Sequence, residues 1–143
     1  MDTGRPHFEV GTKLDPWTDA PLSISDFVRY QGASGDMNPI HHDSSFAESA
    51  GFPGPFAVGM LTAGIAASYV TSSFGPESIR RFRVRWRELG WPGDVMTYAG
   101  TVTDIRQGSE RPELEVVVTV TRQNGEPHLT AWAAVVAPSD EDV

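Results

Sequence analysis

Residues 58–75 read VGMLTAGIAASYVTSSFG and are the most informative stretch for predicting the fold. Its small and apolar side chains leave no polar face for water, and a helix of that kind is usually buried. The stretch becomes polar towards its end, and a membrane span needs about 20 mostly apolar residues. We therefore predict a long helix in the centre of a globular domain.

The periodicity of the chain changes after this helix. In IRRFRVRWRE (79–88), apolar side chains alternate with arginines, which predicts a strand with one apolar and one cationic face. Three further runs rich in Val, Thr and aromatic residues have strand character: VMTYAGTVTDI (95–105), LEVVVTVTR (114–122) and LTAWAAVVA (129–137). Asn124–Gly125 predicts a hairpin between the last two. One buried helix followed by four antiparallel strands predicts an α+β fold, with a curved sheet wrapped around the helix.

Shorter helices are predicted before the long one. Ser23 and Asp26 have the spacing of a capping box, so a helix is expected to begin there. The polar stretch 32–39 is expected to end it. A second short helix is expected from Asp43 or Ser44 to Gly51, and residues 1–20 are expected to form an irregular arm with at most one strand.

Size and composition exclude several classes of protein. The 143 residues suit one domain (1–143), with flexible tails expected at 1–9 and 138–143. No cysteine is present, which excludes disulfides and thiolate metal sites and predicts a cytoplasmic protein. The first ten residues contain no apolar run of signal-peptide length. The net charge of −8 argues against nucleic-acid binding, because that relies on neutralising phosphates.

Residues 34–43, SGDMNPIHHD, are the strongest candidate for chemistry. Asp36 and His41 could form an acid/base pair held on a rigid turn by Asn38 and Pro39. The alternative is a polar loop without catalytic function. His42 is expected to point away from His41, and a metal site is not expected because no other His or Cys cluster supports one. His7 and His128 are expected to be surface residues.

The pattern of this loop resembles that of the MaoC-like dehydratases, which include the (R)-specific enoyl-CoA hydratases. The matching features are SGDMNPIH, the later Pro55 and the GML of 59–61, and FRVRW followed by Pro-Gly-Asp at 92–94. The resemblance runs over about residues 10–137. It is greatest to the single-domain actinobacterial type, including the catalytic subunit of mycobacterial (3R)-hydroxyacyl-ACP dehydratases. It implies a hot-dog fold.

The resemblance also implies an activity and roles for individual residues. The activity is reversible hydration of a trans-2-enoyl thioester to an (R)-3-hydroxyacyl thioester, carried on CoA or an acyl carrier protein, without a metal or other bound cofactor. Asp36 and His41 would be the acid/base pair, and the Gly59 N–H would stabilise the oxyanion. Further residues would orient the loop or contact substrate: Asn38, Pro39, Val58 and Met60. Many relatives have His where this chain has Val58, so that position is expected to affect substrate preference.

Partners and rival functions follow from the same comparison. Four arginines on the cationic strand are candidates to bind the phosphates of CoA or an acidic carrier protein: Arg81, Arg83, Arg85 and Arg87. The alternative for them is a solvated strand face. The family implies a homodimer or a heterodimer with another hot-dog subunit. Two alternative functions stay open: a catalytic subunit that depends on such a partner, and a pathway-specific polyketide or steroid dehydratase. A hot-dog thioesterase is disfavoured, because residues 59–73 contain no Asp or Glu.

Overall fold

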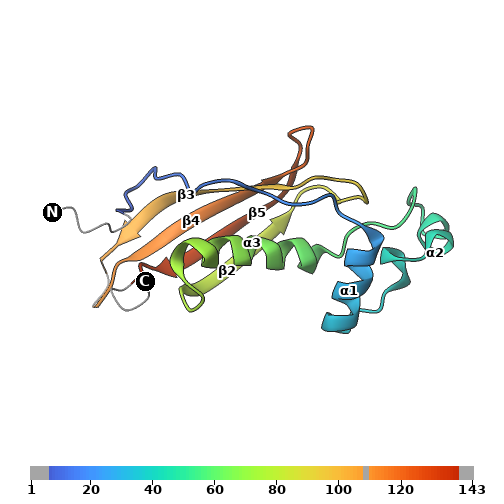
Figure 1. The fold of residues 1–143 in the computed structure, drawn as a ribbon, viewed down its shortest axis with the longest axis horizontal. Helices are drawn as coiled ribbons and strands as arrows, with labels where there is room; N and C mark the ends of the chain where they lie inside the picture. The colour runs from blue at the N-terminus through green and yellow to red at the C-terminus, as the bar shows by residue number, and fades with distance from the viewer. Residues whose placement is uncertain (1–6, 108–109, 139–143) are drawn as a thin grey trace.

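The computed structural model describes residues 7–107 and 110–138, and within them a helix-on-sheet domain (Figure 1). Its elements, in chain order, are β1 (Trp17–Thr18), α1 (Ile24–Ser34), the 3-10 turn η1 (Pro39–His41), α2 (Ser44–Ser49), α3 (Gly59–Phe74), β2 (Ile79–Trp86), β3 (Thr97–Arg106), β4 (Glu113–Thr121) and β5 (Pro127–Val136). The long helix, the short helix after the polar turn and the four long strands are therefore all confirmed.

The strands form one antiparallel sheet in the order β1-β3-β4-β5-β2. The hairpin predicted at Asn124–Gly125 joins β4 to β5, and the Gly125 N–H donates to the Arg122 carbonyl in its turn. The strand that follows α3 in sequence, β2, pairs only with β5 and lies at one edge of the sheet. Such an edge leaves backbone hydrogen-bonding groups available for another chain.

Helix α3 lies along one face of the sheet, as Figure 1 shows, and this contact forms the core. The helix buries Ala66, Val70 and Phe74 against valines of the central strands. The Tyr69 hydroxyl accepts a hydrogen bond from the Gly100 N–H at 3.0 Å. A β-carbon at Gly100 would lie 2.8 Å from Leu14 Cδ1, so any larger residue would require the Leu14 side chain to shift.

The ends of the helices follow local sequence signals. Ser23 caps α1, and the Asp26 carboxylate returns a bond to the Ser23 N–H, which confirms the capping box. The helix continues to Ser34, two residues further than Gly32, where we expected the turn to start. Gly35 then ends it with φ of 78°, a left-handed conformation that glycine adopts without strain.

The segments before α3 gather beyond its N-terminal end. In Figure 1, α1 and α2 extend past the end of the sheet. Much of the predicted tails, residues 1–6 and 139–143, lies outside the described residues. Phe8, which we assigned to the N-terminal tail, packs its ring on Phe74 with centroids 4.8 Å apart. His7 is exposed, as predicted.

Candidate active site

The loop after α1 is built from side chains that bond to nearby backbone. The Asp36 carboxylate accepts from the Asn38 N–H at 3.2 Å. The Asn38 side chain accepts in turn from the Ile40 N–H at 3.1 Å. Asp and Asn favour such turns because their short side chains replace a backbone acceptor. Pro39 begins η1, where its missing N–H costs nothing.

A buried glutamine of α1 anchors this loop from below. Gln31, 2% exposed, donates from Nε2 to the Asn38 carbonyl at 2.8 Å. Its Oε1 accepts from Nδ1 of His42, also at 2.8 Å. His42 therefore bonds to α1 while His41 has a different partner, which confirms that the two adjacent rings point apart. Gln31 links the loop on both sides of η1 to the helix.

Replacing Gln31 with Leu is expected to lower the free energy of unfolding by about 1–3 kcal/mol, because the Asn38 carbonyl and the His42 ring lose a partner. Urea denaturation followed by tryptophan fluorescence measures this. Ser25→Leu, at an exposed position of the same helix, controls for added apolar surface. Equal stability of the two variants would contradict a loop anchored by Gln31.

His41 is held with one ring nitrogen bonded and the other available. The side chain is 8% exposed, and its Nδ1 lies 2.7 Å from the Phe56 carbonyl oxygen. A carbonyl can only accept, so Nδ1 carries the hydrogen and the lone pair of the neutral ring is on Nε2. The Phe56 ring packs edge-on against the imidazole, with centroids 5.2 Å apart. Among the described residues, no group bonds to Nε2.

A pocket of about 260 Å³ brings His41 together with the beginning of α3. Its walls include His41, Gly59, Arg87 and His128. Asp36 is exposed and is not part of these walls, and within the described residues no direct hydrogen bond joins it to His41. The loop therefore places the two predicted catalytic groups five positions apart on one rigid turn, without direct contact.

Gly59 is the first residue of α3, and its carbonyl accepts from Trp86 Nε1 at 3.0 Å. A β-carbon at this position would lie 3.0 Å from the same indole nitrogen, so the close approach of the Trp86 ring favours glycine here. The Gly59 N–H has no acceptor among the described residues. A free N–H at the start of a long helix is a suitable donor to an anionic oxygen.

His128 is buried, so our prediction of a surface residue was wrong. The side chain is 2% exposed. Nδ1 lies 2.7 Å from the Glu88 carbonyl oxygen, and Nε2 lies 2.8 Å from the Thr62 hydroxyl. His128 lies next to Leu129 at the start of β5, and both residues are buried. The polar partners of His128 lie on other elements. Those partners are distant in sequence, which is why sequence reasoning missed the residue.

The other predicted site residues are not all in this pocket. Val58 is 2% exposed and belongs to the hydrophobic core. Met60 is 56% exposed and lines a separate groove between α3 and β2.

Among the arginines, only Arg87 lines the pocket with His41. The strand register places Arg81, Arg83 and Arg85 on the sheet face that points away from α3. Arg81 pairs with Glu115 at 2.8 Å, and the Arg83 guanidinium lies 4.5 Å from the centre of the Trp132 ring. The structure thus does not bring these three arginines near His41.

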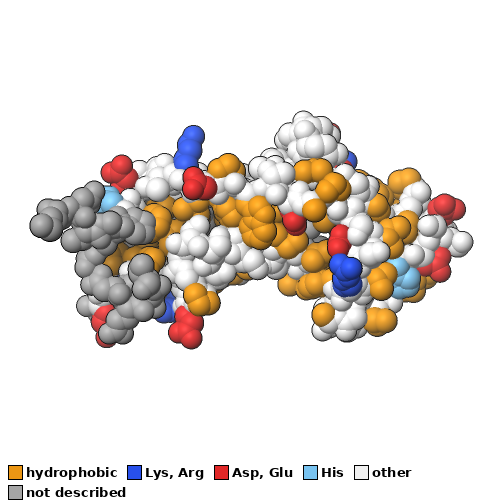
Figure 2. Space-filling model, in the orientation of Figure 1, with side chains coloured by type: hydrophobic (Ala, Val, Ile, Leu, Met, Phe, Trp, Pro, Cys, Tyr) orange, Lys and Arg blue, Asp and Glu red, His pale blue; other side chains and the backbone are white. Residues whose placement is uncertain are grey.

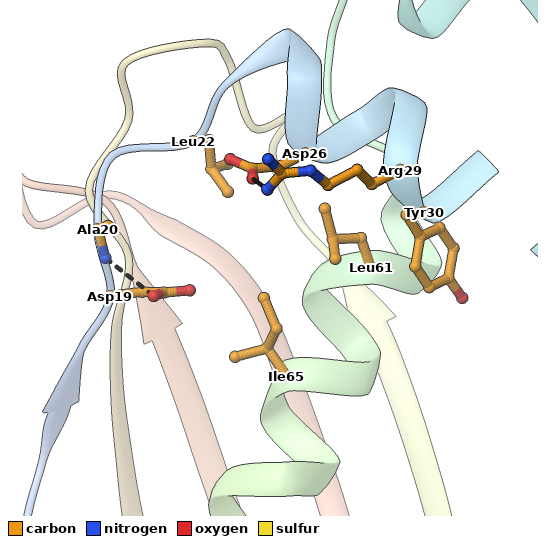
Figure 3. A pocket seen from close by; sticks show the side chains of 8 residues that line it. All are labelled: Asp19, Ala20, Leu22, Asp26, Arg29, Tyr30, Leu61 and Ile65. Carbon is orange, nitrogen blue, oxygen red and sulfur yellow. Dashed lines mark hydrogen bonds and ion pairs between the residues drawn. The ribbon is translucent and has the colours of Figure 1, made fainter. Parts of the chain in front are cut away.

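A larger pocket of about 400 Å³ lies between α1 and α3 (Figure 3). Leu61 and Ile65 of α3 form an apolar wall, while an Asp26–Arg29 pair at 3.7 Å lies on its rim. It is lined by neither His41 nor Gly59. We therefore assign the chemistry to the smaller pocket.

Two kinds of feature are absent from residues 7–107 and 110–138, the part of the chain that the structure describes. No group of three or more His, Cys, Asp or Glu residues could hold a metal ion. No described helix combines the length and the apolar character needed to cross a membrane.

The sheet, the central helix and the loop are those of a hot-dog domain, and comparison with known proteins agrees. The family described as MaoC like domain matches residues 7–124, so the chain belongs to the MaoC-like family. A structure described as a MaoC-like dehydratase is 30% identical, with a TM-score of 0.82 over 95% of this chain and 43% of that one. An (R)-hydratase from A. caviae involved in PHA biosynthesis is 26% identical, with a TM-score of 0.80 over 92% of this chain and 98% of its own.

Curated relatives include longer proteins. The peroxisomal hydratase-dehydrogenase-epimerase of Saccharomyces cerevisiae is 33% identical over 91 residues, which is 63% of this chain. This chain spans only 10% of that enzyme.

Proposed function

We propose that this chain catalyses the reversible hydration of a trans-2-enoyl thioester to an (R)-3-hydroxyacyl thioester. The observation that carries the proposal is the pocket lined by both His41 and Gly59, the first residue of α3. Membership of the MaoC-like family and likeness to an (R)-hydratase support the reaction class and the configuration. Such a reaction is performed by hydro-lyases.

In the proposed reaction, Asp36 and His41 together hold the attacking water. The water oxygen forms a bond to C3 of the enoyl group, and one member of the pair removes a proton from that water. The π electrons of the C2–C3 bond shift towards the carbonyl, and C2 then receives a proton from the pair. The fixed Nδ1–H bond of His41 leaves Nε2 to make these transfers. A water shared by both groups is compatible with the lack of direct contact between them.

The thioester oxygen becomes negative as the water adds, and we assign its stabilisation to Gly59. Gly59 lines the same pocket as His41, and its N–H lies at the positive end of the α3 dipole. Loss of one such donor typically raises the barrier by about 2.7–4 kcal/mol. The enolate charge is thus met by the backbone, and the proposed reaction needs no metal and no redox cofactor.

The carrier of the acyl group is assigned as CoA or an acyl carrier protein. Arg87 is the cation nearest the chemistry because it lines the pocket. Arg85 lies on the outer face of β2, so a phosphate could reach it from the pocket only by passing around the edge of that strand. A carrier contact at Arg87 therefore has more support than one at Arg81 or Arg83, whose side chains already have partners.

We further propose that a second hot-dog subunit, of the same or a different chain, covers the groove between α3 and β2. The groove has a volume of about 340 Å³, and apolar or small residues line it: Met60, Ala63, Gly64, Ala67, Phe82, Val84 and Trp86. It adjoins the free edge of β2, where another strand could pair. Figure 2 also shows hydrophobic side chains at the end of the molecule that carries α1 and α2, where Val28, Met37 and Phe46 are exposed.

Replacing Gly64 with Arg is expected to give a monomer in native mass spectrometry, because a charge would be buried in the groove. A β-carbon at Gly64 meets nothing within 4 Å, so the isolated subunit tolerates the change. Ser68→Arg, at an exposed position of α3 that does not line the groove, is the matched control. An unchanged oligomer in Gly64→Arg would contradict this interface, and a wild-type monomer that gains activity only with a second hot-dog chain would identify the partner as different.

The activity itself is tested by loss of enoyl-thioester absorbance when the purified chain is mixed with crotonyl-CoA. The product is then resolved by chiral analysis. The (R)-3-hydroxyacyl thioester is the expected product, and formation of the (S) isomer would contradict the proposal.

A further inference from the structure

The buried imidazole of His128 forms part of the pocket wall, but the proposed chemistry does not use it. It lies at the start of β5, and both of its nitrogens are bonded, to the Glu88 carbonyl and the Thr62 hydroxyl. With both nitrogens occupied and 2% exposure, the ring is not placed to exchange protons with a substrate. Its bonds instead join three segments around the pocket: β5, the segment after β2 and the first turn of α3.

The Thr62 hydroxyl has one hydrogen and two acceptors within reach. Its Oγ1 lies 2.8 Å from His128 Nε2 and 3.0 Å from the Gly59 carbonyl oxygen. Burial lowers the pKa of His128 below its usual 6.5, although the Glu88 carbonyl opposes this. The ring is thus neutral at neutral pH, with its hydrogen on Nδ1 facing Glu88. The Thr62 hydrogen then points to Nε2, which needs a donor.

The first turn of α3 is therefore bonded to two strands at once. Thr62 connects it to His128 of β5, and the Gly59 carbonyl connects it to Trp86 of β2. Gly59 carries one of these attachments, and the other lies three residues further along the same turn. The direction of its N–H depends on where they hold the turn.

We propose that Thr62 and His128 are positioning residues that fix the first turn of α3, so that the Gly59 N–H points at the thioester oxygen. This role deepens the proposed function and rests on it. Neither side chain touches the reacting atoms; each acts through Gly59. A displaced donor stabilises the transition state less while leaving the binding of the rest of the substrate intact, so kcat should fall and KM should not change.

The test is Thr62→Val, which preserves the shape of the side chain and removes the hydroxyl. We expect kcat for crotonyl-CoA hydration to fall about tenfold through the misplaced donor. We expect Thr62→Ser, which restores the hydroxyl, to recover most of it. Thr71→Val is the matched control, since Thr71 lies on the same helix and its hydroxyl donates to the Ser68 carbonyl at 3.1 Å, with no strand partner among the described residues.

A second readout does not need activity. The Gly59 amide resonance should shift in the NMR spectrum of Thr62→Val and stay in place in Thr71→Val. Wild-type kcat together with an unmoved Gly59 resonance in Thr62→Val would overturn the inference. A wild-type chain that is inactive both alone and with a second hot-dog subunit would instead refute the proposed function, and the Gly59 resonance would then still decide whether Thr62 positions the turn.

Discussion

His41→Ala is expected to lower kcat for enoyl-thioester hydration by about 100- to 10,000-fold, the usual contribution of one acid/base group. The imidazole that takes part in both proton transfers is removed, while the pocket walls formed by Gly59 and Arg87 remain. Asp36→Asn is expected to produce a loss of similar size. The amide oxygen of the new Asn can still accept from the Asn38 N–H, so the loop remains folded while the carboxylate charge is lost.

The control for His41→Ala is His7→Ala, which removes an exposed imidazole. Initial rates over a range of crotonyl-CoA concentrations separate kcat from KM in each variant. Circular dichroism confirms that each variant is folded. A His41→Ala protein that is folded and retains the wild-type kcat would remove His41 from the mechanism.

Asp94→Asn is expected to cost about 3–5 kcal/mol of unfolding free energy, as is typical when one partner of a buried ion pair is lost. Asp94 is 3% exposed, and its two oxygens accept from Arg122 at 2.9 and 3.1 Å. They also accept from the Gln123 side chain and the Trp91 N–H. An amide cannot accept from all of these donors, and Arg122 would keep only the exposed Glu126, at 2.8 Å, as a counter-ion among the described residues.

Asp104→Asn is the matched control, because its pair with Arg106 is exposed at 53% and 63%. An exposed pair contributes about 0–1 kcal/mol. Urea denaturation at neutral pH compares the two variants. Equal losses would contradict a stabilising role for the buried pair.

The same carboxylate predicts how stability depends on pH. Burial alone would raise the pKa of Asp94, but bonds from Arg122, Gln123 and Trp91 lower it below the ordinary 3.8. A lowered folded pKa means that the contribution of Asp94 is complete above pH 3.8 and is lost as the pH falls through the folded value. The stability gap between wild type and Asp94→Asn should therefore close below pH 3.8.

The sequence was sufficient where structure follows from neighbouring residues. Ser23 and Asp26 form a capping box within a single turn, and Asn124–Gly125 forms a hairpin turn without help from distant residues. The central helix was predictable because no face of residues 59–74 is polar enough for solvent. Alternation in β2 correctly predicted that Arg81, Arg83 and Arg85 share one face, but the expectation that Arg87 belongs with them was wrong, because it follows the end of the strand and lines the pocket.

Features that depend on distant partners could not be predicted. In the sequence, Gln31 has the pattern of an ordinary helix residue. Its role depends on hydrogen bonds to loop residues that come later in the chain. His128 reads as a polar residue near a turn, because Thr62 lies 66 positions earlier in the chain. Arg81, Arg83 and Arg85 share a face of β2, but the strand pattern does not say which face α3 covers. Only the packing of α3 on the sheet places these arginines on the side away from the pocket. Each of these facts depends on tertiary contacts and not on local pattern.

The proposed function requires Asp36 and His41 to hydrate an enoyl thioester at the pocket beside the start of α3. The most direct test is to measure the loss of crotonyl-CoA absorbance with wild type, Asp36→Asn and His41→Ala in parallel at equal folded concentration. We predict turnover to the (R)-3-hydroxyacyl product by wild type and a steep loss in both variants. Undiminished turnover in either variant would contradict the proposed function. So would a wild-type protein that turns over neither CoA nor carrier-protein substrates, whether alone or with a second hot-dog subunit.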